Sequence, residues 1–269
     1  MSPTSGQHKV HFTVQGEGPT VILIHGIAAS ISGWSILGPA LVNNGYRVIA
    51  PDLPGHGESH KPERAEHYHI KEIYSILEKW VESLNLSEKY NLIGHSLGGH
   101  LSLQYGLRHP DRLSGLVLID PFYSPQQLYP FIRWLQRRAA IGAAVLRRTS
   151  VPLLQRAVGW NPEVSKQMNN LERRQMAVDL HRASPMILHI LPTVPDLTPV
   201  LTNIQTPTQV IWGSRDRTLN AASFPKLVAR LPNAAGYQVT GGSHQPHLTQ
   251  ADIVTPLVLE FLNKLTQNN

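Results

Sequence analysis

The sequence predicts an α/β fold, in which helices flank a mostly parallel central sheet and a helical cap is inserted between two strands. Two observations predict it. Short, β-branched apolar runs alternate with helical patterns over residues 1–120 and again over 203–269, as is typical of a parallel sheet with crossover helices. Between residues 121 and 202 the strands disappear, and prolines and short amphipathic stretches replace them. We therefore expect residues 1–120 and 203–269 to form the core and residues 121–202 to form the cap.

Five apolar runs fit strands that are buried on both faces of the sheet, because they are short, β-branched and almost free of charge. They are Thr20–Gly26, Arg47–Asp52, Tyr90–His95, Leu113–Asp120 and Thr208–Gly213. Polar and apolar residues alternate in Lys9–Val14, which fits an edge strand, and Ala235–Thr240 is a further candidate strand.

Helical spacing is clearest from Tyr68 to Leu86, where apolar residues recur at i, i+3 and i+4 and charged residues occupy the opposite face. Leu97–Arg108 and Ile253–Leu265 also fit helices that pack on the sheet. In the cap, one apolar stripe combines Leu128, Phe131, Ile132, Leu135 and Ala139. We expect this stripe either to face a substrate pocket, with Arg133 and Arg137 toward water, or to pack on the core.

The composition is that of an ordinary globular protein, with 41% hydrophobic and 16% charged residues among 269. The absence of cysteine excludes disulfides, thiolate metal sites and a cysteine nucleophile. No apolar run approaches the ~20 residues that a membrane span needs, so we expect no stable membrane insertion. The first residues, MSPTSGQHKVHF, lack the apolar core of a secretory signal, and we expect a cytoplasmic location.

The formal net charge of +6 raises the possibility of an anionic partner. Much of the excess lies in one stretch of arginines: Arg133, Arg137, Arg138, Arg147, Arg148 and Arg156. No nucleic-acid-binding motif surrounds them, so we expect no nucleic-acid partner. We interpret them as a solvated helix face, with an anionic substrate or a membrane surface as the alternatives.

The strongest motif is Gly94-His95-Ser96-Leu97-Gly98-Gly99, which lies between an expected strand and an expected helix. The G-x-S-x-G pattern is informative in this strand–turn–helix context. A serine at the apex of a tight, strained turn projects its hydroxyl above the sheet edge, and glycines two residues away give the neighbouring backbones room. The helix that follows directs its N–H groups toward the serine. The pattern predicts Ser96 as a nucleophile.

Together with four further segments, this motif resembles the α/β-hydrolase superfamily. The segments are HGIAAS (His25–Ser30), PDLPGHGES (Pro51–Ser59), IWGSRD (Ile211–Asp216) and GGSHQPHL (Gly241–Leu248). They extend from residue 25 to 248, so the resemblance covers nearly the whole chain apart from the cap. It implies a serine esterase-like or lipase-like hydrolase, whereas the substrate stays open because this fold supports many reactions.

A serine hydroxyl needs a general base, usually a histidine held by a carboxylate, and in this fold the acid and then the histidine follow the serine. Only His244 and His247 follow the last expected strand, and His244 occupies the loop position where the family carries its base. Asp216 matches the family position of the acid. Asp120 ends the previous strand and competes with Asp216, because some members of the family take their acid there.

Two backbone N–H groups, those of Ile27 and Leu97, are the predicted oxyanion hole. The mechanism requires no cofactor. The loop histidines His60, His67 and His69 have no carboxylate or cysteine at ligand spacing, so we expect no metal site.

These observations predict a hydrolase that cleaves small to medium carboxylic esters through an acyl-enzyme on Ser96. A C–C bond hydrolase, a perhydrolase or a lyase with the same triad is the alternative within enzymes. Serine at position 96 disfavours a haloalkane dehalogenase or an epoxide hydrolase, which would carry aspartate there. A hydrolase-fold receptor for a small molecule, with slow turnover, is the alternative outside enzymes. The sequence does not indicate the acyl group, the alcohol or the oligomeric state.

Overall fold

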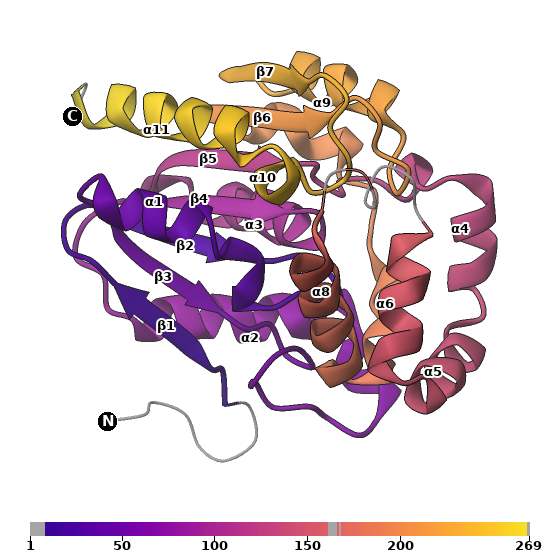
Figure 1. Ribbon diagram of the computed structural model, residues 1–269. Coiled ribbons are helices and arrows are strands. Elements are labelled where there is room, and N and C mark those ends of the chain that lie inside the picture. The colour runs from indigo at the N-terminus through magenta and orange to yellow at the C-terminus, as the bar shows by residue number, and fades with distance from the viewer. Residues whose placement is uncertain (1–8, 161–165, 167, 268–269) are drawn as a thin grey trace.

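A seven-stranded sheet forms the centre of the computed structural model, which describes residues 9–160, 166 and 168–267 (Figure 1). The strands follow the order β1-β3-β2-β4-β5-β6-β7. β1 is antiparallel to β3, and every other neighbouring pair is parallel. Their bounds are Phe12–Gln15 (β1), Thr20–Ile24 (β2), Arg47–Pro51 (β3), Tyr90–His95 (β4), Leu113–Ile119 (β5), Thr208–Gly213 (β6) and Ala234–Val239 (β7). The predicted fold class is confirmed, and each expected strand exists.

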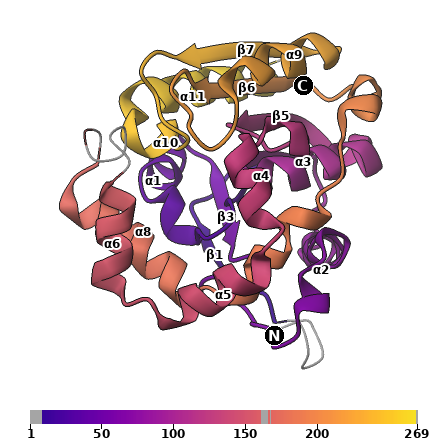
Figure 2. The same cartoon turned by 90° about the vertical axis from the view of Figure 1, so that its right-hand side faces the viewer.

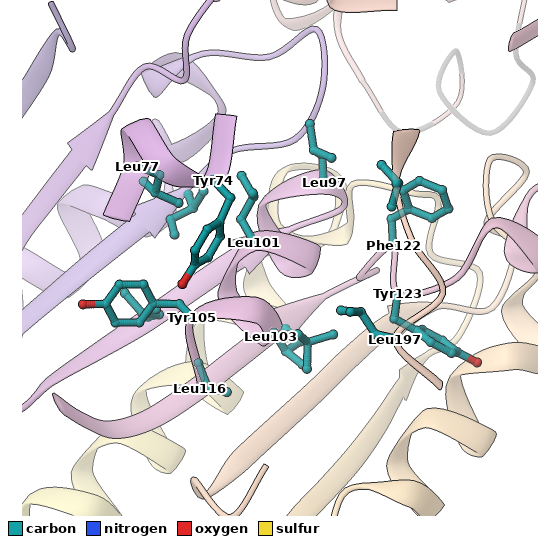
Figure 3. Close-up of a cluster of buried hydrophobic side chains, with 14 of the residues drawn as sticks. Tyr74, Leu77, Leu97, Leu101, Leu103, Tyr105, Leu116, Phe122, Tyr123 and Leu197 are labelled. Atoms are coloured by element: carbon teal, nitrogen blue, oxygen red, sulfur yellow. The ribbon is translucent and has the colours of Figure 1, made fainter. Parts of the chain in front are cut away.

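Alternate residues of the central strands face two separate hydrophobic cores. In β2, for example, Ile22 and Ile24 belong to one core and Val21 and Leu23 to the other, as the two-residue period of a strand requires. The first core contains α2 (Ile70–Ser83), α3 (Leu97–Arg108) and α9 (Phe224–Arg230), and Figure 3 shows part of it. The second contains α1 (Leu37–Asn43) and α11 (Ala251–Gln267). Helices therefore cover both faces of the sheet.

The helix expected over Tyr68–Leu86 is shorter than the periodicity indicates. His69 has extended backbone angles (φ −72°, ψ 138°), and its Nδ1 accepts a hydrogen bond from Lys71 N–H at 3.2 Å. This N-cap starts α2 at Ile70, and the preceding residues Ala65–Tyr68 form a 3₁₀ turn instead. The apolar stripe nevertheless faces the core, with Ile70, Ile73, Tyr74 and Leu77 buried.

In the described part of the segment after β5, four helices lie together on one side of the molecule (Figure 2). They are α4 (Pro130–Gln136), α5 (Ala139–Arg148), α6 (Val151–Gly159) and α8 (Asn170–Arg182). Three 3₁₀ turns, Pro185–His189, Leu191–Thr193 and Thr198–Asn203, lead from them back to β6. A short helix, α10 (Pro246–Thr249), precedes α11. No helix in the described part of the chain combines the length and the apolar character that crossing a bilayer requires.

Candidate active site

A strained turn at Ser96 joins β4 to α3. Ser96 has φ 52° and ψ −114°, a conformation that residues with a Cβ rarely adopt. Two hydrogen bonds hold it: Ser96 N–H donates to the Ile119 carbonyl at 3.0 Å, and the Ser96 carbonyl accepts from Phe122 N–H at 3.0 Å. A Cβ on Gly98 would collide with the Ile24 carbonyl of the neighbouring strand. The glycine is therefore required by the close approach of α3 to β2, and the turn is fixed by the strand on each side.

Hydrogen bonds link the three predicted catalytic residues in series. His244 Nε2 lies 3.0 Å from Ser96 Oγ, and His244 Nδ1 lies 2.7 Å from Asp216 Oδ2. With the proton of the neutral imidazole on Nδ1, facing the carboxylate, Nε2 presents its lone pair to the serine hydroxyl. The serine is nearly buried, and the Asp216 side chain has no exposed surface. The arrangement can transfer the hydroxyl proton of Ser96 to an imidazole.

Backbone N–H groups fix the Asp216 carboxylate in the loop after β6. Thr218 N–H and Leu219 N–H donate to Asp216 Oδ1 at 2.7 and 2.9 Å. The other oxygen, Oδ2, is left for His244. The loop therefore directs the carboxylate at His244.

Asp120, the competing acid, lies behind Asp216 rather than beside His244. It ends β5 with φ 42°, is fully buried, and accepts a hydrogen bond from Gly213 N–H at 3.0 Å through Oδ1. Its side chain is also hydrogen-bonded to Asp216. Burial and the neighbouring Asp216 charge raise the pKa of Asp120 well above its usual value. The raised pKa favours the protonated form of Asp120.

The buried histidines around the site have structural contacts. Burial and the nearby imidazoles of His247 and His244 lower the pKa of His95 well below its usual value, and burial lowers the pKa of His247 to about 3. Both rings therefore stay neutral at physiological pH. His95 Nε2 lies 2.8 Å from the His244 carbonyl and holds the loop of the base. Sequence reasoning missed this contact, because 149 residues separate the two histidines.

The loop after β2 lies against the nucleophile, as the predicted oxyanion hole requires. A Cβ built on Gly26 would lie 3.1 Å from the Ser96 Cβ. His25 fixes this loop, since its Nδ1 lies 2.7 Å from the Gly26 carbonyl and its Nε2 accepts from Leu53 N–H at 2.9 Å. Ile27 follows in the loop, and Leu97 is the first residue of α3, where N–H groups are free of helical partners.

The carboxylates and base could hold a metal only by giving up this network. Ligand atoms of Asp120, Asp216 and His244 lie within 4.8 Å of one another. The hydrogen bond between His244 Nδ1 and Asp216 Oδ2 already uses two of those atoms. Among the described residues, His60, His67 and His69 belong to no such group.

A pocket of about 360 Å³ lies between the loop after β2, the residues after His244, and the cap. Its apolar wall consists of Ile27, Ala28, Val158, Met168, Leu171, Met176, Leu180 and Leu248. Its polar lining includes Glu172, Gln175, Asp179 and Gln245, and no lysine, arginine or histidine of the described residues lines it.

Asp179 links α8 to the loop after β2 at this pocket, and no motif in the sequence predicted the link. Ser30 Oγ and Gln175 Nε2 donate to Asp179 Oδ1 at 3.1 and 3.0 Å, and Ser32 Oγ donates to Oδ2. The carboxylate is buried. Because Ser30 and Asp179 lie 149 residues apart, no local pattern could have paired them.

Of the two alternatives expected for the apolar stripe, the described side chains of Leu128 and Ile132 favour packing on the core over facing the pocket. Leu128 is buried in the first core, and Ile132 packs against the same core. Neither lines the pocket, whose cap wall comes from α6 and α8. Arg137 is exposed as expected, whereas Arg133 is half-buried. The side chains of Phe131 and Leu135 lie outside the described part.

Comparison with known proteins establishes the family. Residues 19–251 match the alpha/beta hydrolase fold family, so the chain belongs to this family. It is 27% identical over 265 residues to 2-hydroxy-6-oxononadienedioate/2-hydroxy-6-oxononatrienedioate hydrolase 1 of Pseudomonas putida, covering 94% of this chain and 91% of that protein. It is 25% identical, with the same coverage, to 2-hydroxy-6-oxo-6-phenylhexa-2,4-dienoate hydrolase of Burkholderia cepacia. An esterase structure from Thermogutta terrifontis superposes with a TM-score of 0.81 at 24% identity, over 98% of this chain and 96% of that one. The protein is a hydrolase of this family.

Proposed function

We propose that the protein hydrolyses small to medium, uncharged carboxylic esters through an acyl-enzyme. The observation that carries the proposal is the hydrogen-bond series from Asp216 through His244 to Ser96, at a strained turn beside an apolar pocket. Attack by an activated serine on an ester carbonyl is the reaction that such a series supports. Hydrolysis needs only water besides the ester.

In the first half of the reaction Ser96 Oγ attacks the ester carbonyl while its proton moves to His244 Nε2. The negative charge that develops on the carbonyl oxygen is stabilised by the N–H groups of Ile27 and Leu97. The tetrahedral intermediate then breaks its bond to the alcohol oxygen, and His244 returns the proton to the departing alcohol. Asp216 stabilises the imidazolium in between. The acyl group remains esterified to Ser96.

In the second half a water molecule replaces the alcohol. His244 accepts one proton of this water, whose oxygen attacks the acyl carbon, and then gives the proton to Ser96 Oγ as the acyl bond breaks. The carboxylic acid leaves, and the free serine is restored. Both halves use the same oxyanion N–H groups, because the charge develops on the same oxygen.

The size and lining of the pocket support the proposed substrate range. A volume of about 360 Å³ is at the small end of ligand pockets. Its leucine, isoleucine and methionine wall favours an apolar acyl or alcohol group, each buried CH₂ adding about 0.8 kcal/mol until the pocket is full. The buried Asp179 carboxylate disfavours an anionic group in the same space.

A C–C bond hydrolase is the second candidate, because the two relatives described above are named as hydrolases of 2-hydroxy-6-oxo compounds that contain no ester. The named substrates of those relatives are dienoates and dienedioates, which carry carboxylate groups. Here Glu172 and Asp179 line the pocket, and none of its described lining residues is cationic. The charge of the pocket therefore favours the neutral ester over the dienoate.

A substrate panel separates the candidates. We expect kcat/KM for p-nitrophenyl esters to rise over the first few acyl carbons and then to fall, and to exceed kcat/KM for 2-hydroxy-6-oxo-6-phenylhexa-2,4-dienoate. Ser96→Ala is the control for every substrate. A higher kcat/KM for the dienoate would identify a C–C bond hydrolase instead, and tight ligand binding without turnover would indicate a receptor.

A further inference from the structure

The outer face of the cap exposes large hydrophobic side chains. Among the described residues, every large hydrophobic side chain that is more than half exposed lies in the cap. These residues are Trp134, Ile141, Val145, Leu153, Trp160 and Leu171. Trp160 and Leu171 are 78% and 75% exposed. They belong to α4, α5, α6 and α8 or directly follow one of them, and these helices share the side that faces the viewer in Figure 2.

The cap also carries the whole net charge of the protein. Residues 121–202 contain ten lysines and arginines and four aspartates and glutamates, which gives +6, the same as the full chain. The other residues are therefore balanced, with fourteen of each sign.

Charged and apolar side chains are interleaved on the same helix faces. On α6, exposed Arg156 lies three residues after Leu153 and four before Trp160, a spacing that places all three on one face. On α5, exposed Ile141 and Val145 are followed by exposed Arg148 at the same kind of spacing. On α8, exposed Arg174 lies three residues after Leu171.

We propose that this outer face of the cap docks on a bilayer surface containing anionic lipids. Tryptophan and leucine side chains enter the boundary between headgroups and acyl chains, and arginines extend their guanidinium groups to the lipid phosphates. A second copy of the chain is a poorer occupant, because two faces of the same charge would repel each other. An uncharged apolar partner would leave the arginines without counter-charges.

Docking in this way places the mouth of the pocket at the bilayer. Leu171 both lines the 360 Å³ pocket and is exposed on the cap face. It also lines an open groove between α6 and α8 with Pro152, Gln155 and Arg174. An ester dissolved in the bilayer could reach the pocket along this groove. This consequence for the substrate depends on the proposed esterase function, whereas docking itself does not.

Vesicle sedimentation tests the docking without using turnover. Vesicles of phosphatidylcholine alone are compared with vesicles in which phosphatidylglycerol replaces part of it. We expect sedimentation with the anionic vesicles and much less with the neutral ones, and release as salt is raised. Arg148→Gln with Arg156→Gln should lower the partition coefficient about 25-fold, since each surface cation contributes about fivefold. Leu153→Ser with Trp160→Ser should lower it about tenfold or more.

Matched control variants change the same residue types outside the cap. Val14→Ser with Tyr237→Ser removes two exposed hydrophobic side chains of the sheet edges, and Lys79→Gln with Lys226→Gln removes two exposed cations. Both should leave vesicle binding unchanged. All variants should keep the wild-type circular dichroism and the wild-type turnover of a water-soluble ester, which separates loss of docking from loss of folding or of esterase function.

Four results would overturn the docking proposal. The first is equal sedimentation with neutral and anionic vesicles, and the second is no sedimentation with either. The third is a dimer in sedimentation velocity that Leu153→Ser with Trp160→Ser dissociates, because a second copy would then cover the cap face. Vesicle binding lowered equally by the control variants would likewise exclude the cap as the docking surface.

Discussion

Replacing Asp120 with asparagine separates the roles of the two buried carboxylates behind His244. Asparagine keeps an oxygen that can accept the Gly213 N–H, and its amide has N–H donors in place of the carboxyl proton that the raised pKa of Asp120 favours. We therefore expect Asp120→Asn to keep kcat near the wild-type value. Asp216→Asn should lower kcat by about 10⁴, because an amide at that position favours the wrong tautomer of the base.

The same substitution should change how stability depends on pH. Because the pKa of Asp120 is raised in the folded protein, the folded state keeps a proton that the unfolded chain releases above about pH 4. The stabilisation is complete below that pH and is lost as the pH rises toward the folded-state pKa. The loss is about 1.4 kcal/mol for each pH unit between the unfolded-state and the folded-state pKa. Asp120→Asn has no carboxyl proton to lose, so as the pH rises its free energy of unfolding should increase by this amount relative to that of the wild type.

Calorimetry measures this gain directly. An unfolding entropy of about 2.1 cal/mol/K per residue gives about 0.56 kcal/mol/K for this chain, so the Tm difference between Asp120→Asn and wild type should widen by about 2.4 °C for each pH unit in that interval. Asp196→Asn is the control. Burial raises the pKa of Asp196, but hydrogen bonds from Thr198 outweigh burial and lower it, so its contribution should be constant in this range.

Two results would refute the assignment of the proton to Asp120. A Tm difference that stays constant from pH 5 to 7 would mean that Asp120 is ionised in the folded protein. A loss of kcat in Asp120→Asn that exceeds the loss in Asp216→Asn would mean that Asp120 is the acid of the triad.

The other predictions concern the nucleophile, the turn and the pocket. Ser96→Ala should lower ester turnover by about 10³-fold or more with unchanged circular dichroism, and activity that survives the substitution would exclude Ser96 as the nucleophile. A fluorophosphonate should label the wild type at Ser96 only. Gly98→Ala should lower the free energy of unfolding, measured in urea, by about 3 kcal/mol or more, because its methyl group would collide with the Ile24 carbonyl. A loss below about 1 kcal/mol, as is common for point substitutions, would contradict that geometry. Asp179→Asn should raise kcat/KM about tenfold for an anionic ester but not for its neutral analogue, because it removes a nearby negative charge.

The fold could be predicted because its strongest constraints are local in sequence. Buried parallel strands leave continuous apolar runs, and both β2 and β5 are buried along almost their whole length. The turn at Ser96 needs glycine at fixed spacings, so it too leaves a local pattern. Helix ends were less predictable, because the start of α2 depends on the cap formed by His69 rather than on apolar periodicity.

The candidate site was predictable in its residues but not in its connections. Chain order pointed to Ser96, Asp216 and His244, and the structure brings these three together. The position of Asp120 behind Asp216 depends on β5 and β6 being neighbours, with Ile119 paired to Ile211. Apolar runs in a sequence indicate that two strands exist, but they do not indicate that the strands are neighbours. Asp120 could therefore be predicted only as an alternative to Asp216 for the acid.

The surface that covers the apolar stripe of the cap could not be chosen from the sequence, for a physical reason. An amphipathic stripe indicates that a helix has a buried side, but several surfaces could cover it, and Leu128 and Ile132 pack on the core rather than the pocket. The charges of the cap are separated instead: Glu172 and Asp179 line the pocket, while arginines such as Arg156 lie outside. The core residues carry no net charge and include Ser96, His244 and Asp216. Substituting the exposed cap residues should therefore alter binding to the bilayer. Substituting the residues that line the pocket should alter which ester is hydrolysed. Neither set of substitutions should change kcat for a small soluble ester, which depends on the core residues.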